Sequence, residues 1–141
     1  MIATAVVLLS LLAGCGGAAP SAGTSTDPSD QVVDVRLTDG LRIELDTATI
    51  RTGRPVAFRV TNKGASDHEF YLGTASEQAA HATEMAQMGA MMHDDEHGVG
   101  VSPGETKTLM RTFPTPGEIL AGCHVGGHYA LGMVTTITIL E

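Results

Sequence analysis

Residues 123–133 read Cys-His-Val-Gly-Gly-His-Tyr-Ala-Leu-Gly-Met, the most informative segment of the sequence. It joins two stretches of alternating apolar and polar side chains, at about 118–123 and 133–140. Every second residue of a β-strand faces the same side. Cys123 therefore shares a face with two apolar residues before it, and Met133 shares one with two isoleucines after it. Both sulfur atoms are predicted to point into the interior of a β-sheet protein.

Similar short alternations begin at Val32 and are separated by turn sequences such as Asp39-Gly40 and Pro103-Gly104, a pattern typical of an all-β sandwich. The segment from Thr74 to Met92, rich in Ala, Glu, Gln and Met, is predicted to form one helical insertion. Polar residues are expected on the opposite strand faces, at Arg42, Glu44, Arg59 and Glu69. Seven strands are predicted. The inward residues of the first four are Val33/Val35/Leu37, Leu41/Ile43/Leu45, Val56/Phe58/Val60 and His68/Phe70/Leu72. The other three strands span about 105–113, 118–123 and 133–140.

The 123–133 segment also carries a candidate metal site. Cys123, His128 and Met133 offer a thiolate, an imidazole and a thioether, and His68 on the inward face of its own strand can meet them. Two His, one Cys and a weak axial Met are the ligand set of a blue-copper centre, which shuttles single electrons. Zinc also accepts Cys and His, but the thioether favours copper.

Each candidate ligand also has a simpler interpretation. A buried Cys is most often a small apolar side chain, and Met often fills gaps in a core. His68 alone could be a core histidine with satisfied hydrogen bonds. Strand alternation turns His124 away from Cys123, so we expect it at the surface or behind the ligands. The combined spacing of the four ligand residues favours a metal site.

With these residues in view, Val32 to Glu141 resembles a bacterial cupredoxin. The Cys-x4-His-x4-Met spacing, with Gly127-His128 and Gly132-Met133, is similar to that of the rusticyanin and sulfocyanin branch. The resemblance implies a Greek-key sandwich of seven or eight strands that transfers electrons. It also implies one mononuclear copper ion, held by His68, Cys123, His128 and Met133.

A second group of soft donors follows the fourth predicted strand. On a helix, His81, Met85, Met88 and Met92 would form one stripe, and His93 and His97 follow among acidic residues. Thioethers and imidazoles bind copper, so the segment is a candidate accessory copper site. Packing of the Met stripe on the sandwich is the alternative.

The N-terminus predicts export and a lipid anchor. The apolar run from Ile2 to Leu12 is shorter than the ~20 residues that cross a bilayer, and it ends in Leu12-Ala13-Gly14-Cys15, which resembles a bacterial lipoprotein cleavage box. We expect residues 1–14 to be a signal peptide, Cys15 to be lipidated, 15–30 to be a flexible tether and 31–141 to be the folded domain. A buried N-terminal strand or helix is the alternative.

Charge and composition narrow the function. The formal charge of −8 argues against nucleic-acid binding. With one cysteine left after lipidation and no His-x-His pair, the chain lacks ligands for a binuclear or trinuclear copper cluster, so we expect no enzyme. Two functions remain. The first is an extracytoplasmic, lipid-anchored, monomeric electron carrier that serves a cytochrome or a terminal oxidase or reductase. The second is a copper-homeostasis protein that binds or delivers copper.

Overall fold

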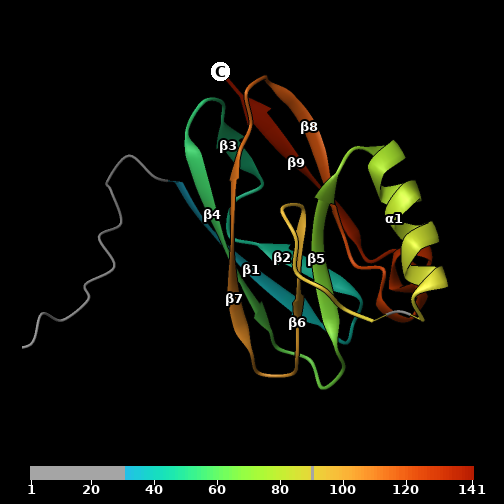
Figure 1. Ribbon diagram of the computed structural model, residues 1–141. Helices are drawn as coiled ribbons and strands as arrows, with labels where there is room; N and C mark the ends of the chain where they lie inside the picture. Colours follow the sequence, from blue (N-terminus) through green and yellow to red (C-terminus); the bar gives the residue numbers. More distant parts are fainter. Residues whose placement is uncertain (1–30, 90) are drawn as a thin grey trace, which may run out of the picture.

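The computed structural model describes residues 31–89 and 91–141, in which two β-sheets pack face to face (Figure 1). The predicted signal peptide, Cys15 and the tether lie outside the described residues. The first sheet has the strand order β2-β1-β4-β7, and the second has the order β3-β9-β8-β5-β6. The strands are β1 (Gln31–Thr38), β2 (Arg42–Leu45), β3 (Thr49–Arg51), β4 (Pro55–Asn62), β5 (His68–Gly73), β6 (Gly98–Val101), β7 (Thr106–Thr112), β8 (Gly117–Gly122) and β9 (Val134–Leu140).

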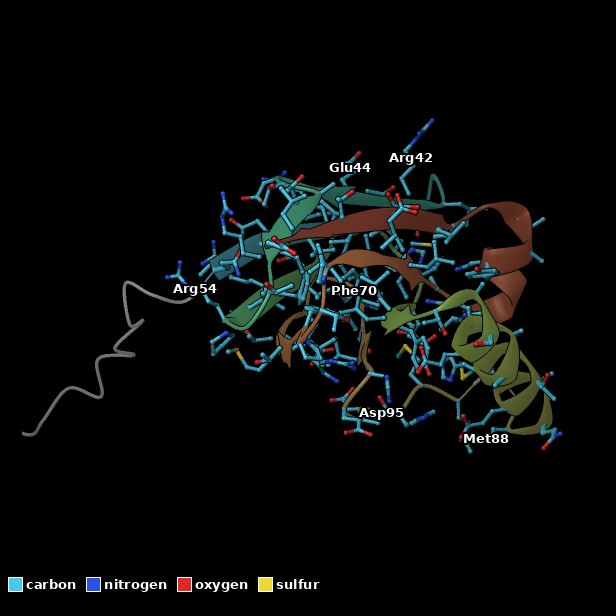
Figure 2. All side chains as sticks on the ribbon, turned by 90° about the horizontal axis from the view of Figure 1, so that it is seen from above. Arg42, Glu44, Arg54, Phe70, Met88 and Asp95 are labelled. Atoms are coloured by element: carbon cyan, nitrogen blue, oxygen red, sulfur yellow. The ribbon has the colours of Figure 1, made fainter. Side chains whose placement is uncertain are left out.

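The core lies between the sheets and follows the predicted alternation. The inward residues of β1 and β4 are buried, and Phe58 on β4 meets Phe70 on β5 across the core, with ring centroids 5.5 Å apart. Figure 2 shows Phe70 in the interior, while Arg42 and Glu44 on β2 point away from it. The all-β sandwich predicted from the sequence is confirmed.

Two strands in the described residues, β3 and β6, were not predicted. β3 has three residues and β6 has four, so neither is long enough to show an alternating pattern. β3 pairs in parallel with β9, and β6 pairs antiparallel with β5. They bring the strands of the described residues to nine.

The helical insertion is α1 (Ala75–Gln87), which packs on the outer face of the second sheet against β5 and β8 (Figure 1). A capping box starts it: the Thr74 side chain accepts from the Glu77 amide, and the Glu77 carboxylate accepts from the Thr74 amide at 2.6 Å. The predicted helix end at Met92 is wrong. Met88 is the C-cap, and Gly89 follows with a φ of 68°, a left-handed conformation that favours glycine and ends helices.

None of the helices in the described part of the chain has the length and apolar character needed to cross a bilayer.

Helix α1 changes the environment of β5, because it covers the strand face that points away from the core. Glu69 lies on that outer face, as predicted, yet it is only 1% exposed, and the neighbouring Tyr71 is buried as well. The His81 ring of α1 stacks on Tyr71 with a centroid distance of 3.8 Å. At β5 the second sheet thus carries a largely apolar inner face and a buried polar outer face.

Candidate metal centre

Three predicted ligand residues converge at one end of the second sheet. His68 begins β5, Cys123 follows β8, and His128 lies on η1 (Val125–Leu131), a short helical segment that leads toward β9. Because β5 and β8 are antiparallel neighbours, with Tyr71 opposite Gly122, the end of β8 lies beside the start of β5. Cys123 Sγ is 3.9 Å from His68 Nδ1 and 3.5 Å from His128 Nδ1.

These distances fit a metal ion bound by all three side chains. A metal about 2.0 Å from each nitrogen and about 2.3 Å from the sulfur, at tetrahedral to trigonal angles, separates nitrogen from sulfur by ~3.5–3.7 Å. The two observed separations, 3.5 and 3.9 Å, bracket that range. Thiolate selects soft ions such as Cu(I), and imidazole also suits Cu(II), so this donor set fits copper.

Met133, the fourth predicted ligand, closes the loop and is fully buried. Its amide donates to the His128 carbonyl at 3.0 Å, and its carbonyl accepts from the Cys123 amide at 3.1 Å. Gly126 and Gly127 have φ values of 58° and 80°, so the loop needs glycines to make its sharp turn. The backbone therefore ties Met133 to both other ligand residues of the loop.

Burial favours the neutral forms of the Cys123 thiol and the His128 ring in the metal-free protein. It raises the pKa of the Cys123 thiol to about 11, and amide donation to the sulfur from Glu69, at 3.3 Å, and from Val125 offsets only part of that rise. Burial also lowers the pKa of His128, and the nearby His68 lowers it further. A neutral His128 keeps a lone pair for a metal, whereas the thiol must release its proton to bind one.

A rigid turn positions His68. The fully buried Asn62 side chain donates to the carbonyls of Ser66 and Val101, both at 2.8 Å, and accepts from the Gly64 amide at 2.8 Å. These three hydrogen bonds join the end of β4 to the segment just before His68 and to β6.

Asp39, in the turn between β1 and β2, holds the same segment before His68. Its carboxylate accepts from the amides of Ala65 and Ser66, which hold the pKa of Asp39 below its usual value. Asp39 Oδ1 is 3.4 Å from His68 Nε2, a contact too poorly aligned to satisfy that buried nitrogen as a hydrogen bond.

His124 turns away from Cys123, as predicted, but it is buried and not at the surface. Its Nε2 lies 2.7 Å from Gln78 Oε1, and its ring stacks on Tyr129. Burial, with a contribution from His81, lowers the pKa of His124 to about 4. The expectation that His124 lies at the surface was wrong, because α1 covers this face of the second sheet.

Within the predicted Met/His segment, the structure brings two of the histidines together. His81 on α1 and His93 beyond it lie with Glu84, and their potential ligand atoms are all within 4.8 Å of one another. Glu84 was missed, although it follows His81 by three residues and so shares its helix face. Of the other predicted members, Met85 is a buried residue of α1, Met88 caps the helix, Met92 packs near Gly100 of β6, and His97 contacts Arg111.

Solved structures with a similar fold include auracyanins, one of which is entitled a "blue" copper protein, and multicopper oxidases. Auracyanin B matches with a TM-score of 0.62 at 23% identity, over 79% of this chain and 89% of its own. The auracyanin from Roseiflexus castenholzii matches with a TM-score of 0.61 at 21% identity, over 80% and 98%. At this identity the likeness shows the fold alone, which is that of a cupredoxin.

The sequence matches no family model. It is similar to three curated proteins named copper-resistant cuproprotein CopI. The protein from Vibrio cholerae is 39% identical over 110 residues, which cover 77% of this chain and 65% of the relative. The protein from Rubrivivax gelatinosus is 34% identical over 111 residues, which cover 79% and 67%. This chain thus spans about two thirds of each relative's length, and with this similarity and the cupredoxin fold it belongs to the CopI family of cuproproteins.

Proposed function

We propose that this protein binds one copper ion through His68, Cys123, His128 and Met133 and carries single electrons. One observation supports this most directly: the Cys123 sulfur lies within 3.9 Å of an imidazole nitrogen on each of two other elements, in a buried position. Bound copper supplies the Cu(I)/Cu(II) couple.

The residues around the four donors suit a one-electron site. The Glu69 amide donates to the Cys123 sulfur and so stabilises negative charge there. Asn62 and Asp39 hold the turn before His68, while the 123–133 backbone bonds hold the other donors. A firmly held site suits electron transfer, because its donors should move little when the metal changes oxidation state. We also propose that the protein is not an enzyme.

The surface near His128 offers a place for a redox partner. His128 is half-buried, and Leu131 in the same segment is 69% exposed among uncharged neighbours. Exposed apolar residues commonly mark contact surfaces, and transient redox complexes bury little area. We propose that a cytochrome, or a terminal oxidase or reductase, docks here on a monomeric, extracytoplasmic, lipid-anchored protein.

Copper homeostasis is the second candidate function. Two observations favour it. The relatives are named copper-resistant cuproproteins. A second cluster of potential ligands, His81, Glu84 and His93, lies on α1 and on the connection that follows it. In that role the same Cys123 site would bind or deliver extracytoplasmic copper.

Three measurements test these functions. Cu(II) added to the metal-free protein should produce an intense visible thiolate-to-copper band that Cys123→Ser abolishes, with His97→Ala as the matched control that keeps it. A colourless protein that retains zinc and refuses copper would contradict the copper site. Fast, reversible electron exchange with a cytochrome would favour the carrier, whereas copper sensitivity of a deletion strain without a respiratory defect would favour homeostasis.

A further inference from the structure

The turn between β1 and β2 lies beside the segment that leads into β5. β1 and β4 are parallel neighbours, with Leu37 opposite Asn62, so both strands end at the same edge of the first sheet. Just beyond this pairing, the Lys63 amide donates to the Leu37 carbonyl at 2.8 Å. Asp39, in the β1–β2 turn, therefore meets the residues that come immediately before His68.

The Asp39 carboxylate fits closely against this segment. Its oxygens accept from the amides of Ala65 at 2.7 Å and Ser66 at 3.1 Å. Gly64 leaves the room that the carboxylate needs, because a Cβ at this position would overlap Asp39 Oδ1 and lie 2.8 Å from its Cγ. Although 48% of the Asp39 side chain is exposed, two amides and one glycine thus define where its carboxylate lies.

His68 turns one ring nitrogen toward this carboxylate. The ring is fully buried, and within the described part of the chain its Nε2 has no well-aligned hydrogen bond, while Asp39 Oδ1 lies 3.4 Å away. An ionised carboxylate only accepts hydrogen bonds, so it favours a proton on Nε2. A neutral imidazole carries a single ring proton, which leaves the lone pair on Nδ1, 3.9 Å from Cys123 Sγ.

The charge of Asp39 acts on the copper site through this ring. An aspartate is ionised at neutral pH, and the two amides that bind it are uncharged, so they leave its negative charge in place. A carboxylate behind a metal-binding histidine fixes the tautomer and raises the basicity of the ring. Because Cu(II) carries one more positive charge than Cu(I), a nearby negative charge stabilises Cu(II) more.

We propose that Asp39 is a positioning residue of the copper site, which selects the His68 tautomer with a free Nδ1 and favours Cu(II) over Cu(I). This inference rests on the copper site of the proposed function and assigns Asp39 a role beyond holding the turn. The alternative is that Asp39 acts on the fold alone, through the amides of Ala65 and Ser66.

The first test measures the reduction potential of the copper-loaded protein. Asp39→Asn keeps the shape of the side chain and removes its charge, so affinity for Cu(II) should fall about tenfold relative to Cu(I). For a one-electron couple, that change raises the potential by ~59 mV. Glu44→Gln, the matched charge control, removes an exposed carboxylate from β2 that points away from the core, and it should leave the potential unchanged (Figure 2).

A second control separates charge from loosening of the turn. Asn62→Ala removes hydrogen bonds before His68 without changing a charge, and it should move the potential less than Asp39→Asn does. If Asn62→Ala raises the potential as much, or if Asp39→Asn leaves it where Glu44→Gln does, the electrostatic role of Asp39 is refuted.

The remaining test uses the metal-free protein. Nitrogen-15 NMR of labelled histidine at about pH 8, where an ordinary imidazole is neutral, should show His68 protonated at Nε2 and bare at Nδ1. A proton on Nδ1 under these conditions would overturn the tautomer assignment. These failures are distinct from failure of the proposed function, because a missing thiolate-to-copper band in the unmodified protein refutes the copper site itself.

Discussion

Replacing Asn62 with alanine should unfold the turn that presents His68. The change removes three hydrogen bonds of 2.8 Å and leaves the carbonyls of Ser66 and Val101 and the amide of Gly64 without that partner. An unsatisfied buried group costs about 1–3 kcal/mol. The Val101 carbonyl is fully buried, whereas water can reach the other two groups. We therefore expect the free energy of unfolding to fall by ~3 kcal/mol in total.

Urea denaturation of the metal-free protein measures this loss. If the free energy of unfolding falls by ~1.5 kcal/mol per molar urea, a loss of ~3 kcal/mol lowers the urea midpoint by ~2 M. Thr61→Ala is the control: it removes one hydroxyl contact to Thr106 at 3.0 Å on the exposed face and should cost less than about 1 kcal/mol. If the Asn62→Ala midpoint falls no further than that of Thr61→Ala, the Asn62 hydrogen bonds do not hold the turn, and the account of how His68 is positioned fails.

Four further predictions concern the loop, the pH response and the anchor. Met133→Gln should keep copper bound and lower the reduction potential in voltammetry, because an oxygen donor favours Cu(II); complete loss of copper would exclude a weak axial role. Leu131→Lys should slow electron exchange with the physiological partner and leave the copper spectrum and melting temperature intact, and an unchanged rate in a well-folded variant would exclude docking there. The metal-free protein should lose roughly 2–3 kcal/mol between about pH 9 and 11, because the unfolded thiol ionises near 9.0 while the Cys123 thiol stays protonated to about 11. Cys123→Ser should lose less over that range, and equal losses would rule out the thiol as the cause. Finally, Cys15→Ser should abolish acylation in mass spectra of native material, whereas a free, uncleaved Cys15 in the unmodified protein would contradict the anchor.

The sequence was most informative where the determinants are local. Strand alternation placed Cys123 and Met133 inward, and the spacing within 123–133 placed His128 beside them, as the structure finds. His68 is distant in sequence, but the same alternation put it on the inner face of its strand.

The features that were missed depend on contacts between elements. Nothing in the pattern of β5 shows that α1 covers its outer face, so the burial of Glu69 and His124 was not predictable from alternation alone. The helix end was predictable, since Met88-Gly89 carries the usual C-terminal glycine signal. β3 and β6 were too short to recognise, because their stability comes from pairing with longer strands.

The place of β9 has a consequence for how the molecule assembles. β9, the last of the described strands along the chain, lies between β3 and β8 and pairs Thr49 with Thr138 and Gly117 with Ile139. The pairing of β3 with β9 is distant in sequence, and such pairings form slowly because a long loop must close before they are stabilised. His128 and Met133 come immediately before β9, so we expect the donor set to be complete only when β9 has paired with both neighbours. Copper should therefore bind at a shielded Cys123 thiolate only in chains in which β9 has paired. A folding intermediate without β9 in place would expose the Cys123 thiol to oxidation.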